Sequence, residues 1–237
     1  MRILVTAAEE QELQRAKRAL EMVRGSRDVK AQVEFRLTGI GAVQACHCVT
    51  REVVAAAAAG EPYNLVVNLG IAGSYDLEAF PIGSAAVISR EHFADLGFGS
   101  EEGFSDLFQY GILEKDDFPY TKGALARQLL PYPHIEKVLE KYGAGAGATV
   151  QCVTGTQARC NEIVAMYDPQ IESMEGAAVY YVCLQENVPF FELRTVSNEV
   201  GEKEREKWNT PMALESLRRA MFDFFKMLSY NNVKISW

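Results

Sequence analysis

The chain has 237 residues, 48% of them hydrophobic and 24% charged, with a formal net charge of −8. These values predict a globular protein with one large core, and the acidic balance argues against binding to nucleic acid through its phosphates. No apolar run reaches the roughly 20 residues that cross a bilayer, and the N-terminus lacks a secretory pattern. We therefore expect a cytoplasmic protein whose partners include neither nucleic acid nor a membrane.

Cys46-His47-Cys48, together with three further cysteines, raises the question of a metal site. The surrounding alanine-rich stretch predicts a helix, in which residues i and i+2 face different sides. No cysteines show the CxxC spacing of a zinc site. We therefore expect small buried thiols, and predict neither a metal nor a cofactor.

Three apolar runs predict strands, at residues 2–7, 64–73 and 190–198. A charged periodic stretch over residues 9–23 predicts a helix after the first strand, and residues 176–188 predict a helix before the third. Apolar strands that alternate with helices are typical of a mainly parallel sheet covered on both faces. We predict an α/β fold with a central mixed, mainly parallel twisted sheet flanked by helices, in a single domain over residues 1–237.

Two other segments are predicted to be irregular. The GAGAGA stretch at residues 143–148 lacks the GxGxxG spacing of a nucleotide loop, so we interpret it as a flexible turn before a strand over residues 149–155. Residues 92–123 are polar and aromatic with little periodicity, which predicts a loop-rich insertion. Loops of that length in compact domains are usually functional.

Candidate chemistry lies just after the predicted strands. Glu9, Glu10 and Glu12 follow the first strand. Acids favour the first turn of a helix through its dipole, which accounts for Glu9 and Glu10, and composition alone does not separate Glu12 from them. Gly70 and Gly73 end the second strand, where they permit either a tight turn or a close approach of the backbone to a ligand.

Glu175 follows Met174 and precedes small apolar residues. Such a carboxylate is costly unless it is paired in a salt bridge or contacts a ligand, and the sequence leaves both readings open. Arg194 and Asn198 on the third strand point to one face if the strand is regular, and a bulge would change that. The amide of Asn198, beside Ser197, stands at a strand end where an enzyme of this class often has an acid.

Three motifs occur in order, NLGIAGS (68–74), SMEGAA (173–178) and LRTVSN (193–198). Together they resemble the purine nucleoside phosphorylase and nucleosidase superfamily over most of the chain. A narrower pattern, EHFADLGFGSEEGF followed by DDFP and RTVSNEVGEKEREKWN, is similar to the futalosine hydrolase branch, which belongs to the alternative bacterial menaquinone pathway. Glu202-Lys203-Glu204 departs from the Arg-Asp pair of that branch, so no role of the pair is carried over.

The resemblance implies a nucleoside phosphorylase-like domain, a homo-oligomer (dimer or tetramer), a small nucleoside substrate, and hydrolysis of the N-ribosidic bond of futalosine with release of hypoxanthine. It implies that Glu12 is the general base that activates water and that Arg194 helps to order the water and this base. Asn198 would meet the purine. Glu175 would bind the ribose hydroxyls, with Met174 beside the sugar. The full set of implied substrate-binding residues is Ile71, Ala72, Gly73, Met174, Glu175 and Ser197.

Three alternatives are weighed against this function. A phosphorylase needs a cationic or hydroxyl-rich phosphate cradle, whereas Asn68 and Ile71 stand where phosphorylases of the superfamily commonly carry an arginine and a hydroxyl. Methylthioadenosine/S-adenosylhomocysteine-type nucleosidases have an aspartic acid at the position of Asn198, whose amide instead suits a 6-oxopurine. Glu12 and Glu175 together argue against a non-catalytic purine-binding relative. The resemblance leaves residues 92–123 with either a contact to the 5′ side of the substrate or a subunit contact.

Overall fold

The structure is a computed structural model that describes residues 1–101 and 103–230. In that part of the chain, the central sheet is built from β1 (Arg2–Ala7), β2 (Gln32–Leu37), β3 (Leu65–Ser74), β4 (Ala85–Phe93), β7 (Leu125–Ala126), β8 (Gly143–Thr149), β9 (Ile171–Ser173) and β10 (Phe190–Glu199). The helices are α1 (Glu10–Arg24), α2 (Ala42–Ala58), α3 (Pro133–Leu139), α4 (Gln157–Tyr167), α5 (Gly176–Gln185), α6 (Thr210–Tyr230) and the short 3₁₀ helix η1 (Arg205–Lys207). β5 (Gly97–Ser100) and β6 (Gly103–Asp106) form a separate two-stranded sheet.

The central sheet is mixed and mainly parallel, as predicted. β3 pairs in parallel with β1 and β10, and β8 pairs in parallel with β4 and β9. β10 runs antiparallel to β4, and the end of β3 runs antiparallel to β9. β3, β10, β4, β8 and β9 therefore close into a ring of paired strands, with β1 and β2 extending it on one side.

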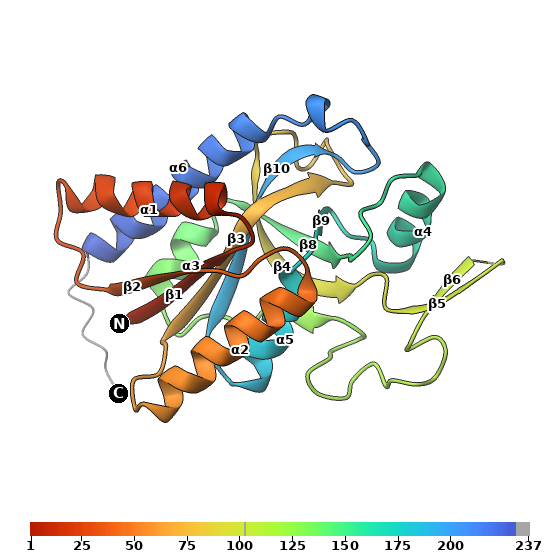
Figure 1. Ribbon diagram of the computed structural model, residues 1–237, viewed down its shortest axis with the longest axis horizontal. Coiled ribbons are helices and arrows are strands. Elements are labelled where there is room, and N and C mark those ends of the chain that lie inside the picture. The colour runs from red at the N-terminus through yellow and green to blue at the C-terminus, as the bar shows by residue number, and fades with distance from the viewer. Residues whose placement is uncertain (102, 231–237) are drawn as a thin grey trace.

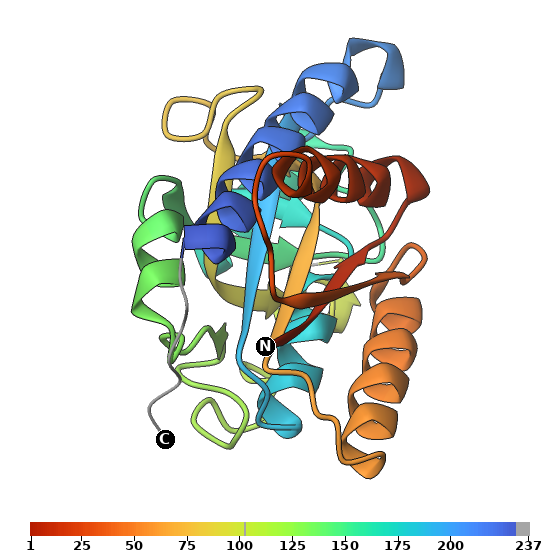
Figure 2. The ribbon, with the colours of Figure 1, turned by 90° about the vertical axis from the view of Figure 1, so that its left-hand side faces the viewer.

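Two apolar clusters cover the sheet, as expected for an α/β domain. One packs α1 and α6 against the strands through residues such as Leu13, Leu217 and Phe224. The other packs α2 and α5 on the opposite side, through residues such as Val49 and Tyr180. Figure 2 shows α1 with α6 on one side of the strands and α2 with α5 on the other. The three strands and the helices predicted from apolar periodicity are confirmed.

The interpretation of residues 143–148 as a turn was wrong, because they form most of β8 in the central sheet. The glycines serve close packing: a Cβ at Gly143 would lie 2.8 Å from a ring carbon of Phe80, and one at Gly147 would overlap the carboxyl of Glu91. The strand predicted over residues 149–155 was also wrong beyond Thr149. There the backbone N–H groups of Gln151 and Cys152 donate to the Asp95 carboxylate instead of a strand ladder.

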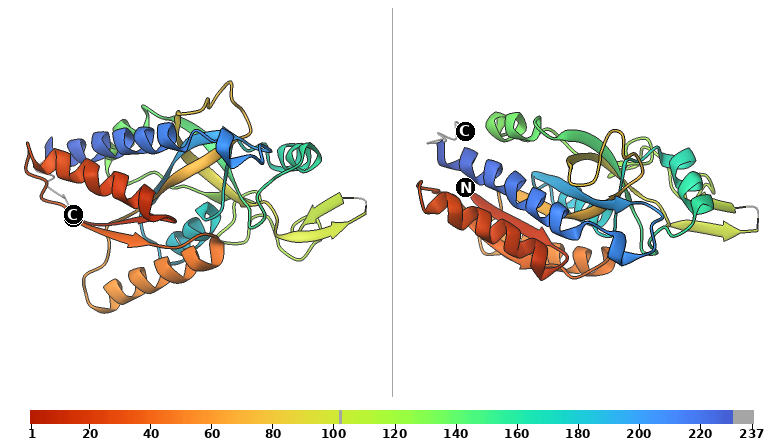
Figure 3. Two further views of the ribbon diagram at one scale, coloured as in Figure 1. Left: turned by 45° about the horizontal axis from the view of Figure 1, so that its top comes forward. Right: turned by 90° about the horizontal axis from the view of Figure 1, so that it is seen from above.

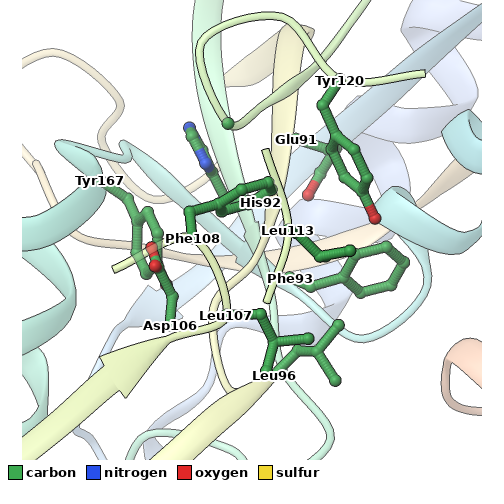
Figure 4. A pocket seen from close by; sticks show the side chains of 11 residues that line it. Glu91, His92, Phe93, Leu96, Asp106, Leu107, Phe108, Leu113, Tyr120 and Tyr167 are labelled. Carbon is green, nitrogen blue, oxygen red and sulfur yellow. The ribbon is translucent and has the colours of Figure 1, made fainter. Parts of the chain in front are cut away.

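Residues 94–124 leave the central sheet after β4 and return to it at β7. They carry the β5–β6 hairpin, which projects from the body of the molecule in Figures 1 and 3. Phe98 stacks on Tyr110 at 3.9 Å between ring centroids, joining the hairpin to the irregular stretch that follows. A small, partly enclosed pocket lies beside this stretch, bordered by Glu91, His92 and Tyr120 among others (Figure 4). His92, predicted to begin the loop-rich segment, belongs to β4.

Candidate active site

A cavity of about 290 Å³ opens where β1, β3, β9 and β10 end. Its lining comes from segments far apart in the sequence: Ala8, Glu9, Glu12, Ile40, Ile71, Ala72, Gly73, Val153, Glu172, Ser173, Met174, Glu175, Arg194, Ser197, Asn198, Arg205 and Trp208. All nine site residues predicted from the sequence are in this set. The edge at which parallel strands end is where α/β folds usually bind ligands, so this cavity is the candidate active site.

Glu12 lies in the first turn of α1 and is 3% exposed. Its Oε2 accepts a hydrogen bond from the Glu9 backbone N–H at 2.9 Å, which closes the start of the helix as a capping box. Its Oε1 accepts from the Ile71 N–H at 2.9 Å, at the cavity end of β3. Burial raises the pKa of this carboxyl above its ordinary value, although the Ile71 hydrogen bond and the charge of Arg194 oppose the rise. A fixed carboxylate of raised basicity suits a general base.

Arg194 and Glu175 form a buried ion pair across the cavity floor. Arg194 is 1% exposed, and its Nη2 donates to Glu175 Oε2 at 3.3 Å. Glu175 Oε1 accepts from the Gly41 N–H at 3.0 Å, so both oxygens of this carboxylate are positioned. Burial alone would lower the pKa of Arg194, but the charges of Glu192 and Glu175 outweigh it and raise the pKa, so the guanidinium stays charged. Glu175 is therefore paired in a salt bridge and also lines the cavity, so the two explanations left open by the sequence do not exclude each other.

Gly70 is what allows Arg194 to lie beside Glu12. A Cβ at this position would overlap Arg194 Nη1 and would lie 3.0 Å from Glu12 Oε1. The Cβ and Nη1 cannot share that space, so a side chain here must displace the guanidinium, the carboxylate or both.

Gly70→Ala is accordingly expected to lower kcat by about 100-fold, the scale at which a misplacement of about 1 Å acts on catalysis. Gly99→Ala is the matched control, because a Cβ at that strand glycine meets no heavy atom within 4 Å. Nucleoside hydrolysis and thermal unfolding would be measured on both variants. A Gly70→Ala variant with wild-type kcat would show that the close placement of Arg194 and Glu12 around Gly70 is not needed.

β10 ends in a bulge within the cavity wall. Val196 pairs with Ala72 and Asn198 pairs with Gly73, so Ser197 is the extra residue. The Ser197 Oγ lies 2.7 Å from Asn198 Oδ1, and Asn198 Nδ2 donates to the Glu199 carbonyl oxygen at 2.8 Å. Of the two possibilities left open by the sequence, a regular strand and a bulge, the structure has the bulge, and the side chains of both Ser197 and Asn198 line the cavity.

Several cavity residues were missed by the sequence analysis. Beyond β10, Arg205 begins η1 and Trp208 follows it. The Arg205 guanidinium lies 5.9 Å from the Trp208 ring, and the indole N–H donates to the Glu202 carbonyl oxygen at 3.0 Å. Both residues lie within the RTVSNEVGEKEREKWN motif, but neither was assigned a role there. Glu9, assigned only to helix initiation, caps α1 and also lines the cavity.

Glu172 in β9 was also missed, although it follows the same rule as the predicted residues, an acid at a strand end. Its Oε1 accepts from the Thr154 N–H at 3.1 Å, and its other oxygen accepts from the Tyr75 hydroxyl. Burial, and after it the contact with Glu172, raises the pKa of the Tyr75 hydroxyl far above its ordinary value, so this phenol stays neutral. The hydrogen bond from Thr154 to Glu172 thus holds the segment that includes the cavity residue Val153 against β9.

Two findings concern sites of other kinds. Within residues 1–101 and 103–230, no group of three or more histidine, cysteine, aspartate or glutamate side chains is placed to hold a metal ion. All five cysteines are free thiols, with Cys48 and Cys183 buried. In the same part of the chain, no helix has the length and apolar character needed to cross a membrane.

Comparison with known proteins identifies the family. The family model described as the phosphorylase superfamily matches residues 3–229. The futalosine hydrolase of Streptomyces coelicolor is 34% identical over 186 residues, 77% of this chain and 74% of that protein. The futalosine hydrolase of Thermus thermophilus is 31% identical over 192 residues, 78% of this chain and 77% of that protein. The chain belongs to the futalosine hydrolase family.

Solved structures share the fold of this futalosine hydrolase family member. A 5′-methylthioadenosine/S-adenosylhomocysteine nucleosidase from Helicobacter pylori superposes with a TM-score of 0.74 at 17% identity, covering 98% of this chain and 99% of that chain. The native futalosine hydrolase of Helicobacter pylori gives a TM-score of 0.72 at 18% identity, covering 96% and 97%. At these identities the likeness shows the fold alone.

Proposed function

We propose that this chain hydrolyses the N-ribosidic bond of futalosine, releasing hypoxanthine and dehypoxanthine futalosine in the alternative menaquinone pathway. The family assignment supports the substrate, and one geometric observation supports the chemistry. Glu12, Arg194 and Glu175 line the same cavity as Asn198, with Arg194 bonded to Glu175 and with both Arg194 and Glu12 close to Gly70. A base, an ordering cation, an acceptor for hydroxyls and a polar amide are thus brought together from separate segments of the chain.

Glu12 is the proposed general base. Water attacks C1′ of the ribose while the bond from C1′ to N9 breaks and its electron pair leaves with the purine. The proton that Glu12 takes from water balances the proton that the departing purine finally carries. Arg194 donates to Glu175 and thereby orients that carboxylate, and its nearby charge favours the ionised form of Glu12. Such positioned proton transfer contributes typically about 10²–10⁴-fold.

Glu175 is the proposed partner of the ribose hydroxyls, with Met174 beside the sugar. A carboxylate accepts hydrogen bonds from hydroxyls, and the Gly41 N–H and Arg194 hold it in place before substrate arrives. The sugar becomes oxocarbenium-like as the bond breaks, and the fixed negative charges of Glu12 and Glu175 favour that cation. The proposed binding wall is completed by Ile71, Ala72, Gly73 and Ser197.

The charge of the cavity favours hydrolysis over phosphorolysis. Among the described lining residues, four carboxylates oppose two guanidiniums: Glu9, Glu12, Glu172 and Glu175 against Arg194 and Arg205. Arg194 is already engaged by Glu175 and Glu192, and the Ile71 N–H is bonded to Glu12. A phosphate dianion would meet repulsion where a phosphorylase offers a cationic cradle.

A substrate panel tests this function. Futalosine, aminodeoxyfutalosine, inosine and methylthioadenosine would be incubated with the protein, each with and without phosphate, and the free base measured. We expect the highest kcat/KM for futalosine, with rates that phosphate does not raise. Rates that rise with phosphate would contradict the hydrolase mechanism, and preference for methylthioadenosine would move the chain to the nucleosidase alternative.

Two further predictions remain proposals. A homo-oligomer, dimer or tetramer, is supported by exposed apolar side chains on and beside α2 and α5, including Ile40, Val43 and Tyr181. A cytoplasmic location is supported by five unpaired cysteines, since reducing compartments keep thiols free.

A further inference from the structure

Glu91 of β4 and Glu192 of β10 form a buried carboxyl pair behind the cavity floor. They are 1% and 0% exposed, and neither lines the cavity. β4 and β10 are neighbouring antiparallel strands, so the two side chains come from adjacent strands of the sheet. Within the described residues, Glu91 Oε1 and Glu192 Oε2 have no hydrogen-bond partner of good geometry, although the Asn68 amide lies close enough to Glu192 to lower the pKa of that carboxyl. Two unpartnered buried oxygens need an explanation, because each costs about 1–3 kcal/mol.

The two unpartnered oxygens converge on one glycine. A Cβ at Gly176, the first residue of α5, would overlap Glu91 Oε1 and would lie 2.7 Å from Glu192 Oε2. A Cβ at Gly147 of β8 would overlap the same Glu91 carboxyl. Both oxygens thus border the space that the missing side chain of Gly176 leaves open, and the missing side chain of Gly147 leaves room for the Glu91 carboxyl. The helix following Glu175 could not begin here with any larger residue unless this pair moved.

A single proton shared between the two oxygens would satisfy both. Two ionised carboxylates facing one another in a buried site repel strongly, whereas one proton turns the same contact into a hydrogen bond. Glu192 is assigned as the ionised partner, because its Oε1 accepts from Arg194 Nε and the charge of Arg194 opposes the rise that burial causes in the pKa of Glu192. Glu91 is the protonated partner, because its Oε2 accepts only from the Thr149 hydroxyl at 2.8 Å. Burial and then the charge of Glu192 raise the pKa of Glu91 well above its ordinary value.

We propose that Glu91 and Glu192 are a proton-sharing dyad that positions Arg194 for catalysis, an inference that rests on the proposed nucleosidase function. The dyad fixes the Nε side of the guanidinium through Glu192. The other two nitrogens are thereby aimed at the cavity, Nη2 at Glu175 and Nη1 toward Glu12. Glu91 and Glu192 touch no substrate in this arrangement and act through Arg194 as positioning residues.

Among the titratable groups around the pair, Glu91 is the one whose proton we expect to control the alkaline pH dependence. The charged groups that face it are Glu192 and Arg194 of β10 and Glu175 at the start of α5. Tyr180 of α5 donates to the Ile88 carbonyl oxygen, and burial raises its pKa well above the ordinary value, so it stays neutral. Burial lowers the pKa of neighbouring His92 to about 4, so that ring is also neutral. Tyr120, which borders the same small pocket as Glu91 (Figure 4), has a pKa raised by burial.

Loss of the Glu91 proton is therefore expected to shift Arg194, and with it the active site, although Glu91 does not line the cavity. As pH rises through the raised pKa of Glu91, a second negative charge faces Glu192 and competes for Arg194. Because Glu91 binds its proton more tightly when folded, its contribution to stability is complete below the ordinary glutamate range and is lost as pH rises through the folded pKa. Activity and stability should both decline on the alkaline side.

Glu91→Gln and Glu192→Gln are the matched test. In Glu91→Gln the new amide keeps a donor toward Glu192 and an acceptor for Thr149 but cannot ionise, so the alkaline fall of kcat should move to higher pH. Glu192→Gln removes the charge that holds Arg194 Nε, and kcat should fall by about 10- to 100-fold across the pH range, the scale of one charge-assisted hydrogen bond. KM, measured beside kcat, should change less, because the dyad touches no substrate.

Two readouts decide the dyad without relying on activity. Wild-type protein should show the infrared band of a protonated carboxyl at neutral pH, lost at high pH and absent in Glu91→Gln. The unfolding midpoint of wild type should decline with rising pH relative to Glu91→Gln. A missing band, an unchanged alkaline limb, or equal losses of kcat in both variants would overturn the proposal. If the wild type cleaves no nucleoside, the proposed function fails, while the band and the unfolding midpoints still test the dyad.

Discussion

Glu12→Ala is expected to lower kcat for futalosine hydrolysis by about 10²–10⁴-fold, the contribution of a positioned general base. Glu12 is held at the cavity by the Glu9 and Ile71 N–H groups and lies beside Arg194. Alanine leaves the other cavity residues in place, so purine binding should be largely retained. Steady-state kinetics and calorimetric binding of hypoxanthine would separate the two effects.

Glu10→Ala is the matched control for this variant. Glu10 occupies the same first turn of α1, but its carboxylate is exposed and contacts Lys17 at 3.5 Å. Both changes remove an acid near the helix N-terminus, and only Glu12→Ala removes one from the cavity. Wild-type turnover in Glu12→Ala, or an equal loss in Glu10→Ala, would contradict the base assignment.

The pH profile offers a second check on Glu12. The base must be ionised to accept a proton from water, so kcat/KM should fall as pH falls through the pKa of Glu12. Burial raises that pKa, which places the acid limb at a higher pH than an ordinary glutamate would. The alkaline limb is assigned to Glu91. The enzyme is therefore expected to be active at pH values between the pKa of Glu12 and the pKa of Glu91.

Local patterns predicted a mainly parallel sheet, three of its strands and several of the nine cavity residues, and the family resemblance supplied the remaining cavity residues and their roles. Apolar runs mark β1, β3 and β10, and polar residues at their ends mark the site. Pattern alone did not promote Glu12 above Glu9 and Glu10, since the three acids differ only in where α1 points them. That choice came from the family resemblance.

Other features depend on contacts that no local pattern encodes. β8 looks like a flexible turn, and its glycines make sense only once Phe80 and Glu91 are packed against them. Arg205 reaches the cavity only because the loop after β10 folds back over it. The Glu91–Glu192 pair joins residues 101 positions apart (192 − 91) across two strands, so neither acid looks unusual in sequence.

Asn198→Asp is expected to shift preference from 6-oxopurine toward 6-aminopurine substrates. The Asn198 Oδ1 accepts from the Ser197 hydroxyl and Nδ2 donates to the Glu199 carbonyl oxygen. An amide has two donor hydrogens and two acceptor sites on its oxygen, so one of each remains for the purine. The free N–H suits O6 of hypoxanthine, and the carbonyl oxygen suits a proton on N7.

Aspartate at position 198 would change the number of hydrogen-bond donors and acceptors that face the purine. An ionised carboxylate would place an oxygen 2.8 Å from the Glu199 carbonyl oxygen, a repulsion that favours the protonated acid. The acid proton then donates to Glu199, and only acceptors remain to face the purine. O6 would be repelled and an exocyclic amine would be accepted. An unpaired or repelled buried polar group costs about 1–3 kcal/mol, so the ratio of kcat/KM for futalosine to that for aminodeoxyfutalosine should fall by about 10- to 100-fold.

Asn209→Asp is the control, because it replaces an amide by a carboxyl at a residue that does not line the cavity. Its Oδ1 accepts from the Met212 N–H at the start of α6, a contact that aspartate preserves. The ratio should be unchanged in this variant and altered only in Asn198→Asp. If Asn198→Asp keeps the wild-type ratio, the amide merely closes the end of β10, and base selection must come from elsewhere in the wall. Arg205 is then the next side chain to test, because among the described lining residues it is the cation that Glu175 and Glu192 do not engage.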